Sequence, residues 1–125
     1  MEKFINAIFD FQVNVKVYHW STKSYPRHKA SDEIVDEVQN LGDKFVEVYT
    51  GKYGRDKFLP LGNKNAVIKV LSLTDASIIK YLDDFMAMLT VDLPKFLKNT
   101  DTDLLNIRDE LLGAVAKTKY LFTLS

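Results

Sequence analysis

The sequence predicts an all-α protein, a single four-helix bundle with a long crossover between its second and third helices. Apolar residues recur at helical spacing in four segments, and clusters of turn-forming residues separate those segments. One irregular stretch, residues 51–74, is long enough to travel the length of a bundle. At 125 residues the chain is large enough for one core and too small for two, so we expect residues 1–125 to form one domain.

The first two helices are predicted from helical spacing and from a proline. From Phe4 to about Thr22 the spacing is three or four residues, with the apolar seam Phe4, Ile8, Phe11, Val15 and Tyr18. Pro26 suits the first turn of a second helix that runs to about Thr50. This helix should be buried through Ile34, Val38, Leu41, Phe45 and Tyr49. Gly51 and Gly54 would stop it.

The irregular stretch contains a short apolar run from Val67 to Leu73. The run could be a strand or a short helix. We favour a helical turn or two, because a single strand without a partner would leave its backbone groups unpaired. A connection of this length predicts that the two helices it joins run parallel.

Two further helices complete the predicted bundle. Thr74 or Asp75 would cap the third, which carries Ile78, Leu82, Phe85 and Leu89. Pro94 would kink this helix or separate a last short piece from it. The capping residues between Asn99 and Asp103 then start a final helix with the apolar residues Leu104, Ile107, Leu111, Val115 and Phe122.

Composition excludes several classes of function. Lys plus Arg and Asp plus Glu are 17 each, so no global field attracts nucleic acid or an anionic membrane. Without cysteine there is no disulfide, thiol nucleophile or cysteine zinc site, and any metal must be bound by N and O ligands. No signal peptide and no membrane span is visible, so we expect a cytoplasmic protein.

Four side chains that can bind metals lie along one edge of the second predicted helix: His28, Asp32, Asp43 and Glu47. At about 100° per residue they fall at about 0°, 40°, 60° and 100° around the helix axis. At about 1.5 Å per residue, however, the first pair is about 16 Å from the second. The four cannot share one metal ion, and each pair is half of a site.

A two-fold axis would complete these half-sites. It would lay the His/Asp pair of one chain opposite the Asp/Glu pair of another and so close two equivalent sites. Carboxylate and imidazole ligands suit Fe(II), Mn(II) or Zn(II), and redox chemistry favours iron. The other interpretation is that the acidic residues form only a solvated face opposite the apolar stripe: Asp32, Asp36, Asp43 and Glu47.

The same residues carry a resemblance to a known family, the Dps-like miniature ferritins. The pattern is His19-Trp20, then His28, with an Asp four, an Asp fifteen and a Glu nineteen residues after His28. The stretches 19–25, 27–30 and 51–55 are also similar to compact Dps-like proteins of bacteriophages and large DNA viruses. The resemblance covers residues 18–55 and implies a ferritin-like four-helix bundle.

The resemblance also implies an activity. Asp43 and Glu47 of one chain would bind iron together with His19, His28 and Asp32 of a two-fold partner, and these five residues would be both metal ligands and catalytic groups. Fe(II) would be oxidised by peroxide or dioxygen, and ferric mineral would be stored in a hollow homo-oligomeric shell of twelve subunits. Zn²⁺ or Mn²⁺ could take the same site. Such a protein would protect against oxidative damage in a host cytoplasm, or in a virion if it is viral.

This chain departs from the family pattern in two places. The interval from His19 to His28 is three residues shorter than usual, so the turn between the helices is tighter. The lysine-rich tail that many Dps proteins use on DNA is not seen, so we do not expect direct DNA binding. The alternative function is a non-catalytic structural or DNA-associated protein, viral in origin, that retains the ferritin-like fold.

Other polar or sulfur-containing residues are weaker candidates for a site. Asp109 and Glu110 are favoured as capping or ion-pair residues, because the helices lack the Glu-x-x-His motifs of a site within one subunit. Met86 and Met88 are favoured as core residues. The basic residues Lys52, Arg55 and Lys57 could contact phosphate, although a solvated loop is favoured.

Overall fold

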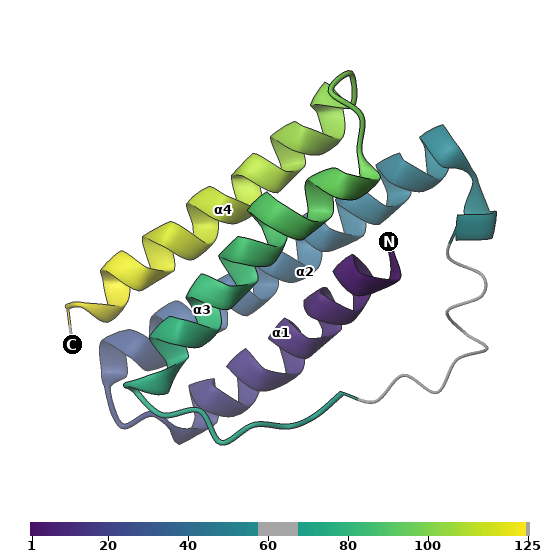
Figure 1. Ribbon diagram of the computed structural model, residues 1–125. Coiled ribbons are helices and arrows are strands. Elements are labelled where there is room, and N and C mark those ends of the chain that lie inside the picture. The colour runs from purple at the N-terminus through teal and green to yellow at the C-terminus, as the bar shows by residue number, and fades with distance from the viewer. Residues whose placement is uncertain (58–67, 125) are drawn as a thin grey trace.

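The computed structural model describes residues 1–57 and 68–124, and these form an all-helical bundle without strands (Figure 1). Its helical elements are α1 (Glu2–Ser21), α2 (Tyr25–Tyr53), η1 (Arg55–Lys57), α3 (Ser77–Ala87), η3 (Met88–Asp92), η4 (Leu93–Phe96) and α4 (Thr102–Phe122). The predicted four main helices are confirmed.

The direction of the helices follows from the long connection between α2 and α3. In Figure 1, α1 and α2 run antiparallel, α2 and α3 run in the same direction, and α4 returns antiparallel to α3. α2 packs against both α1 and α4, while α3 packs against α4 and α1. The predicted bundle with parallel second and third helices is therefore observed.

The core is formed by the apolar stripes that helical spacing predicts. The seam of α1 from Phe4 to Tyr18 is buried, and so are the predicted core residues of α3, η3 and α4. In α2 the predicted residues are also buried, except Leu41, which is partly buried against the core. Burial of these stripes stabilises four helices whose individual propensities would leave them marginal in water.

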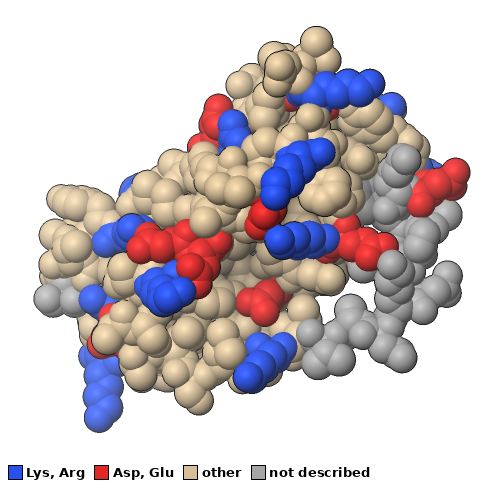
Figure 2. Space-filling model, in the orientation of Figure 1, with Lys and Arg blue, Asp and Glu red and all other residues tan. Residues whose placement is uncertain are grey.

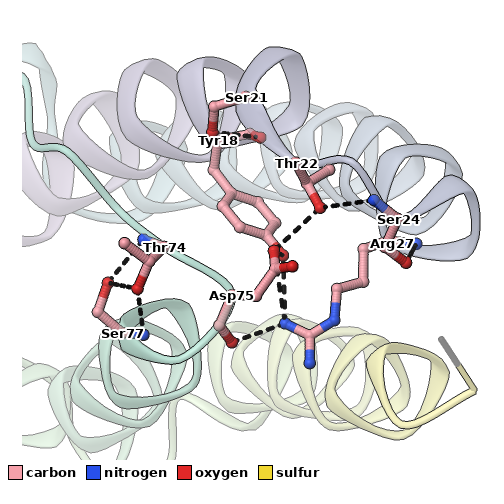
Figure 3. Close-up of polar contacts among 8 residues, drawn as sticks. All are labelled: Tyr18, Ser21, Thr22, Ser24, Arg27, Thr74, Asp75 and Ser77. Atoms are coloured by element: carbon pink, nitrogen blue, oxygen red, sulfur yellow. Dashed lines mark hydrogen bonds and ion pairs between the residues drawn. The ribbon is translucent and has the colours of Figure 1, made fainter.

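A polar cluster fixes one end of the bundle, where α1, α2 and α3 meet (Figure 3). Tyr18 Oη donates to Asp75 Oδ1 at 2.7 Å, and Thr22 Oγ1 donates to the same oxygen at 2.9 Å. Arg27 Nη1 donates to the carbonyl oxygen of Asp75 at 2.7 Å and to Tyr18 Oη at 3.2 Å. The hydrogen bond from Tyr18 lowers the pKa of Asp75, so its carboxylate stays ionised.

Side-chain hydrogen bonds mark the starts of α2 and α3. Ser24 Oγ accepts from Arg27 N at 3.3 Å, and Pro26 lies in the first turn of α2, as predicted. Before α3, Thr74 Oγ1 accepts from Ser77 N at 3.1 Å while Ser77 Oγ accepts from Thr74 N at 2.8 Å. These bonds tie the predicted cap residue Thr74 to the first residue of α3, whereas the N-cap position itself is Ala76, which makes no side-chain cap hydrogen bond.

The crossover corrects one prediction. Residues 68–74 form no helix, so the expected helical turns are wrong there, and Val67 lies outside the described residues. The backbone is paired instead by the side chain of Asn14, which is fully buried. Leu71 N donates to Asn14 Oδ1 at 2.7 Å, and Asn14 Nδ2 donates to Lys69 O at 3.0 Å. The amide thus supplies the donor and acceptor that a neighbouring strand would offer.

Asn14 is itself positioned by a neighbour on α1. Its Nδ2 lies 3.2 Å from Asp10 Oδ1, and this carboxylate accepts a hydrogen bond from Tyr81 Oη of α3. Burial, reinforced by the bond to Asp10, raises the pKa of Tyr81 and keeps its proton in place. A continuous series of hydrogen bonds therefore links α3, α1 and the crossover.

The segment after α3 changes helix type before Pro94. The π-helical turn η3 leads into the 3₁₀ turn η4, which contains Pro94 near its start. Because proline has no N–H and fixes φ, it is tolerated in a first turn but ends the hydrogen-bond ladder before it. The prediction that Pro94 separates off a last short piece is confirmed.

Asp101 fixes the opposite end of the bundle, where α2 ends and α4 begins. The side chain of Asp101 is 2% exposed, and both of its oxygens accept from Tyr53 Oη, at 2.7 and 2.6 Å. Lys52 Nζ lies 2.6 Å away, and Lys98 N donates at 2.8 Å. These donors, the Lys52 ammonium first, hold the pKa of Asp101 well below its usual range.

We predict that Asn14→Leu destabilises the protein by about 1–2 kcal/mol, because the crossover loses a donor and an acceptor at once. Denaturant unfolding followed by circular dichroism would measure the loss, and amide hydrogen exchange at Leu71 should become faster. Asn106→Leu, at an exposed position of α4, is the control and should change stability by less than about 0.5 kcal/mol. An unchanged exchange rate at Leu71 would contradict the role assigned to Asn14.

We predict that Asp101→Asn lowers the free energy of unfolding at pH 7. The difference in unfolding free energy between the variant and wild type should shrink in acid. Because the folded-state pKa of Asp101 is depressed, its contribution is complete above the unfolded pKa of about 3.9 and is lost as the pH falls towards the folded value. Unfolding free energies between pH 7 and pH 2 would test this, with exposed Asp109→Asn as the control. A difference in unfolding free energy that stays the same from pH 7 to pH 2 would contradict this role of Asp101.

Candidate metal centre

The short turn between α1 and α2 brings two histidines face to face. His19, in the last turn of α1, is buried, and His28, in the first turn of α2, is exposed. His19 Nδ1 lies 2.6 Å from the carbonyl oxygen of His28, and His28 Nδ1 lies 2.9 Å from that of His19. The two imidazole rings stack with their centroids 3.9 Å apart.

This reciprocal pairing assigns the tautomer of both rings. A carbonyl oxygen only accepts, so the Nδ1 of each histidine must carry the proton in these bonds. In the neutral form, each Nε2 then keeps its lone pair for a ligand. A backbone carbonyl that orients a histidine in this way is the usual partner behind a metal-binding imidazole. The tight turn therefore orients both His19 and His28 so that the Nε2 lone pair of each ring can bind a metal ion.

Asp32 lies beside this histidine pair, one turn further along α2. Its Oδ1 is 3.9 Å from His19 Nε2 and 3.0 Å from Lys16 Nζ. The hydrogen bond and charge of Lys16 lower the pKa of Asp32, so the carboxylate is ionised at neutral pH. Within one chain, Asp32 thus lies near His19 and is paired with Lys16.

The second predicted pair, Asp43 and Glu47, is exposed further along α2. A hydrogen bond with Asp43, together with the charge of that residue, raises the pKa of Glu47. Asp43 and Glu47 are one helical turn apart on α2, a spacing that places two side chains next to each other on the helix surface. The two carboxyl groups are therefore neighbours that could bind one cation together.

A groove of about 380 Å³ runs between α1 and α2 beside Asp43. Its other lining residues include Phe9, which is 49% exposed, and Val46. The two helices come close here because Gly42 has no side chain. A Cβ at that position would lie 3.1 Å from Ile8 Cγ2.

The two pairs do not meet within one chain. Across residues 1–57 and 68–124, no three His, Cys, Asp or Glu side chains are grouped so that they could hold a metal ion. The helical rise still separates the pairs by about 16 Å. A complete site of the predicted kind therefore requires a second copy of the chain.

Trp20 lies beside the histidine pair and is 69% exposed. The ammonium of Lys16 is 5.9 Å from the centre of the Trp20 ring, within the range of a cation–π contact. Sequence reasoning did not single out Lys16, although its spacing of three residues from His19 and four from Trp20 places all three on one face of α1.

The weaker candidates have other contacts. Asp109 accepts from Arg108 Nε at 2.8 Å, and Glu110 is exposed beside the groove between α2 and α4. Met88 is buried, and Met86 packs against the core. The ammonium of Lys52 is held by Asp101 and Asp103, at 2.6 and 2.8 Å, so its charge is already paired.

Surface charge is mixed on the face shown in Figure 2, where Lys and Arg lie next to Asp and Glu. Lys119 pairs with Asp83, and Lys80 with Asp84 at 2.9 Å. Among the described residues, no helix is both long enough and apolar enough to span a membrane.

Comparison with known proteins gives one relative and one family. The chain is 30% identical over 131 residues to an uncharacterized 14.6 kDa protein of the mobD-ri intergenic region of Enterobacteria phage T4, covering 98% of this chain and 88% of the relative. No solved structure matches the chain. The model of the "Family of unknown function (DUF5856)" matches residues 19–122, which begin at the first histidine of the pair. The chain therefore belongs to the DUF5856 family.

Proposed function

We propose that this protein is a Dps-like iron protein, which oxidises Fe(II) at a site shared by two copies of the chain and stores ferric iron inside a ferritin-like shell. The observation that carries the proposal is the His19–His28 pair, because both rings are oriented with Nε2 available for a ligand. Asp32 on the same edge, and the carboxyl pair of Asp43 and Glu47, supply the oxygen ligands.

The ligand chemistry supports Fe(II) as the substrate. Neutral imidazole nitrogens and carboxylate oxygens are intermediate and hard donors, a mixture that suits Fe(II), Mn(II) and Zn(II). Asp43 raises the pKa of Glu47, and a cation bound between the two carboxyl groups would offset this effect. Zn²⁺ and Mn²⁺ would compete for the same ligands.

A two-fold partner is supported by the surface that α1 and α2 share. At one end this surface carries His28 and Asp32, and at the other the acids Asp43 and Glu47 beside the exposed ring of Phe9. An antiparallel copy would place Asp43 and Glu47 of one chain against His28 of the other and would cover Phe9.

The reaction balances with peroxide as the oxidant. Two Fe(II) ions give two electrons to one hydrogen peroxide molecule, which takes up two protons and forms two water molecules, while the iron becomes Fe(III). The part of the protein is to hold Fe(II) between opposed imidazole and carboxylate groups and to leave a position open for the oxidant. Dioxygen could act in its place.

The helix order supports the proposed shell. One long crossover joining parallel helices is the connection found in ferritin-like bundles. Twelve copies of the 14.4 kDa chain would give about 173 kDa, and a closed shell needs a second kind of symmetry contact besides the two-fold.

A second candidate is a non-catalytic four-helix structural or DNA-associated phage protein. The ion pair between Lys16 and Asp32 favours it, because this carboxylate is already neutralised without a metal ion. The two candidates differ in their response to iron, which the following experiment measures.

We predict that the wild-type protein accelerates Fe(II) oxidation by peroxide, and that Asp43→Asn/Glu47→Gln lowers the rate at least about 100-fold, because two ligands are lost. Anaerobic Fe(II) loading followed by peroxide, monitored by absorbance, would measure the rate. Circular dichroism should show unchanged helix content in the variant.

The matched control is Glu33→Gln/Glu37→Gln. It removes two exposed acids with the same spacing on α2, but from positions about 140° and 180° around the helix from His28. Its oxidation rate should equal that of wild type. Oxidation by the wild-type protein at only the buffer rate would favour the structural candidate.

We predict that the protein is at least a dimer at micromolar concentration and that the storage form is near 173 kDa, twelve times the 14.4 kDa chain. Light scattering after size-exclusion chromatography would give the mass. A monomer alone would rule out the shared site, whereas a dimer alone would retain the site and rule out storage in a shell.

A further inference from the structure

Lys16 places a positive charge at the oxygen that a metal ion would bind. Its Nζ is 3.0 Å from Asp32 Oδ1, and the same oxygen lies 3.9 Å from His19 Nε2. The ammonium comes from α1, whereas the carboxylate comes from α2, so the ion pair crosses between the two helices. A cation of the chain itself therefore lies against this half of the candidate site.

The position of Lys16 is defined by two contacts. Besides the bond to Asp32, its Nζ lies 5.9 Å from the centre of the Trp20 ring. The side chain of Lys16 is 37% exposed and that of Asp32 is 51% exposed, so an incoming ion can reach the pair from solvent. Because an exposed ion pair is worth little on its own, another cation can replace Lys16 at low cost.

The geometry allows one cation at this position. Bonds of about 2.1 Å from one ion to a histidine nitrogen and a carboxylate oxygen place the two ligand atoms about 3–4 Å apart. The 3.9 Å separation of His19 Nε2 and Asp32 Oδ1 falls in this range. A divalent ion between them would lie within a few ångströms of the Lys16 ammonium, where two positive charges repel each other strongly.

We propose that Lys16 is a resident counter-ion of Asp32 that a divalent metal ion must displace, so that the Lys16–Asp32 ion pair and metal binding exclude each other. This proposal rests on the proposed function, since it describes the regulation of the same site. It gives Lys16 two effects. The ion pair keeps Asp32 ionised and in place without metal, and it weakens metal binding until the metal concentration is high enough to compete.

Titration with Co²⁺ alone tests the proposal, because Co²⁺ binds N and O ligands, absorbs visible light when bound and needs no oxidant. The variant is Lys16→Met, which keeps the length of the side chain and removes its charge. We expect Lys16→Met to bind Co²⁺ about five- to tenfold more tightly than wild type, because the competing charge is gone. Calorimetry gives the affinity and absorbance reports the ligand field.

Three further variants separate competition from a general charge effect. Lys23→Met removes the same charge from an exposed residue of the α1–α2 turn, and its Co²⁺ affinity should stay within about twofold of wild type. Lys16→Arg keeps the charge and should also bind like wild type. Lys16→Gln, a polar replacement, should bind more tightly and supports the test if Lys16→Met does not fold.

The outcomes distinguish this proposal from the function on which it rests. If wild type binds Co²⁺ and His28→Ala removes the binding, the proposed metal site at the histidine pair stands. Equal or weaker binding by Lys16→Met and Lys16→Gln would then overturn the role of Lys16 alone. If neither wild type nor these variants bind Co²⁺, both proposals fail. Tighter binding by Lys23→Met to the same extent would also overturn displacement in favour of a general charge effect.

Discussion

The topology of the bundle depends on one buried amide. Asn14 gives the extended crossover an acceptor and a donor, bonding Lys69 O and Leu71 N, so this stretch can lie against α1 without forming a strand or a helix. With the crossover held there, α3 starts at the same end of the bundle as α2 and runs parallel to it. The α1–α2 face with the candidate ligands is left on the outside.

The candidate site depends on a second local constraint, the short turn between α1 and α2. The turn brings the last turn of α1 close to the first turn of α2, so the side chains of His19 and His28 bond each other's carbonyl oxygens. Arg27, within that first turn, is bound to Tyr18 and to the backbone of Asp75 (Figure 3). The contacts that hold this bundle end together thus lie next to the turn that joins the two histidines.

Sequence predicted the features that depend on neighbouring residues along the chain. The four helices and their buried stripes follow from apolar spacing, and Pro26 in the first turn of α2 follows from residue type. The crossover was wrongly predicted because its backbone partner, Asn14, is 55 residues away from Lys69. Lys16 was missed for a similar reason, since its partner Asp32 lies on the next helix. Whether two half-sites meet across a two-fold axis is still a prediction.

Metal binding by mixed dimers tests the shared site most directly. One variant carries His19→Ala/His28→Ala and the other Asp43→Ala/Glu47→Ala, so neither binds Co²⁺ alone. If each site takes its ligands from two chains, half of the randomly mixed dimers are heterodimers, and each has one complete site. Co-refolding equal amounts should therefore restore about a quarter of the wild-type Co²⁺ sites. No binding after co-refolding, with heterodimers demonstrated by mass spectrometry, would contradict a site shared between subunits.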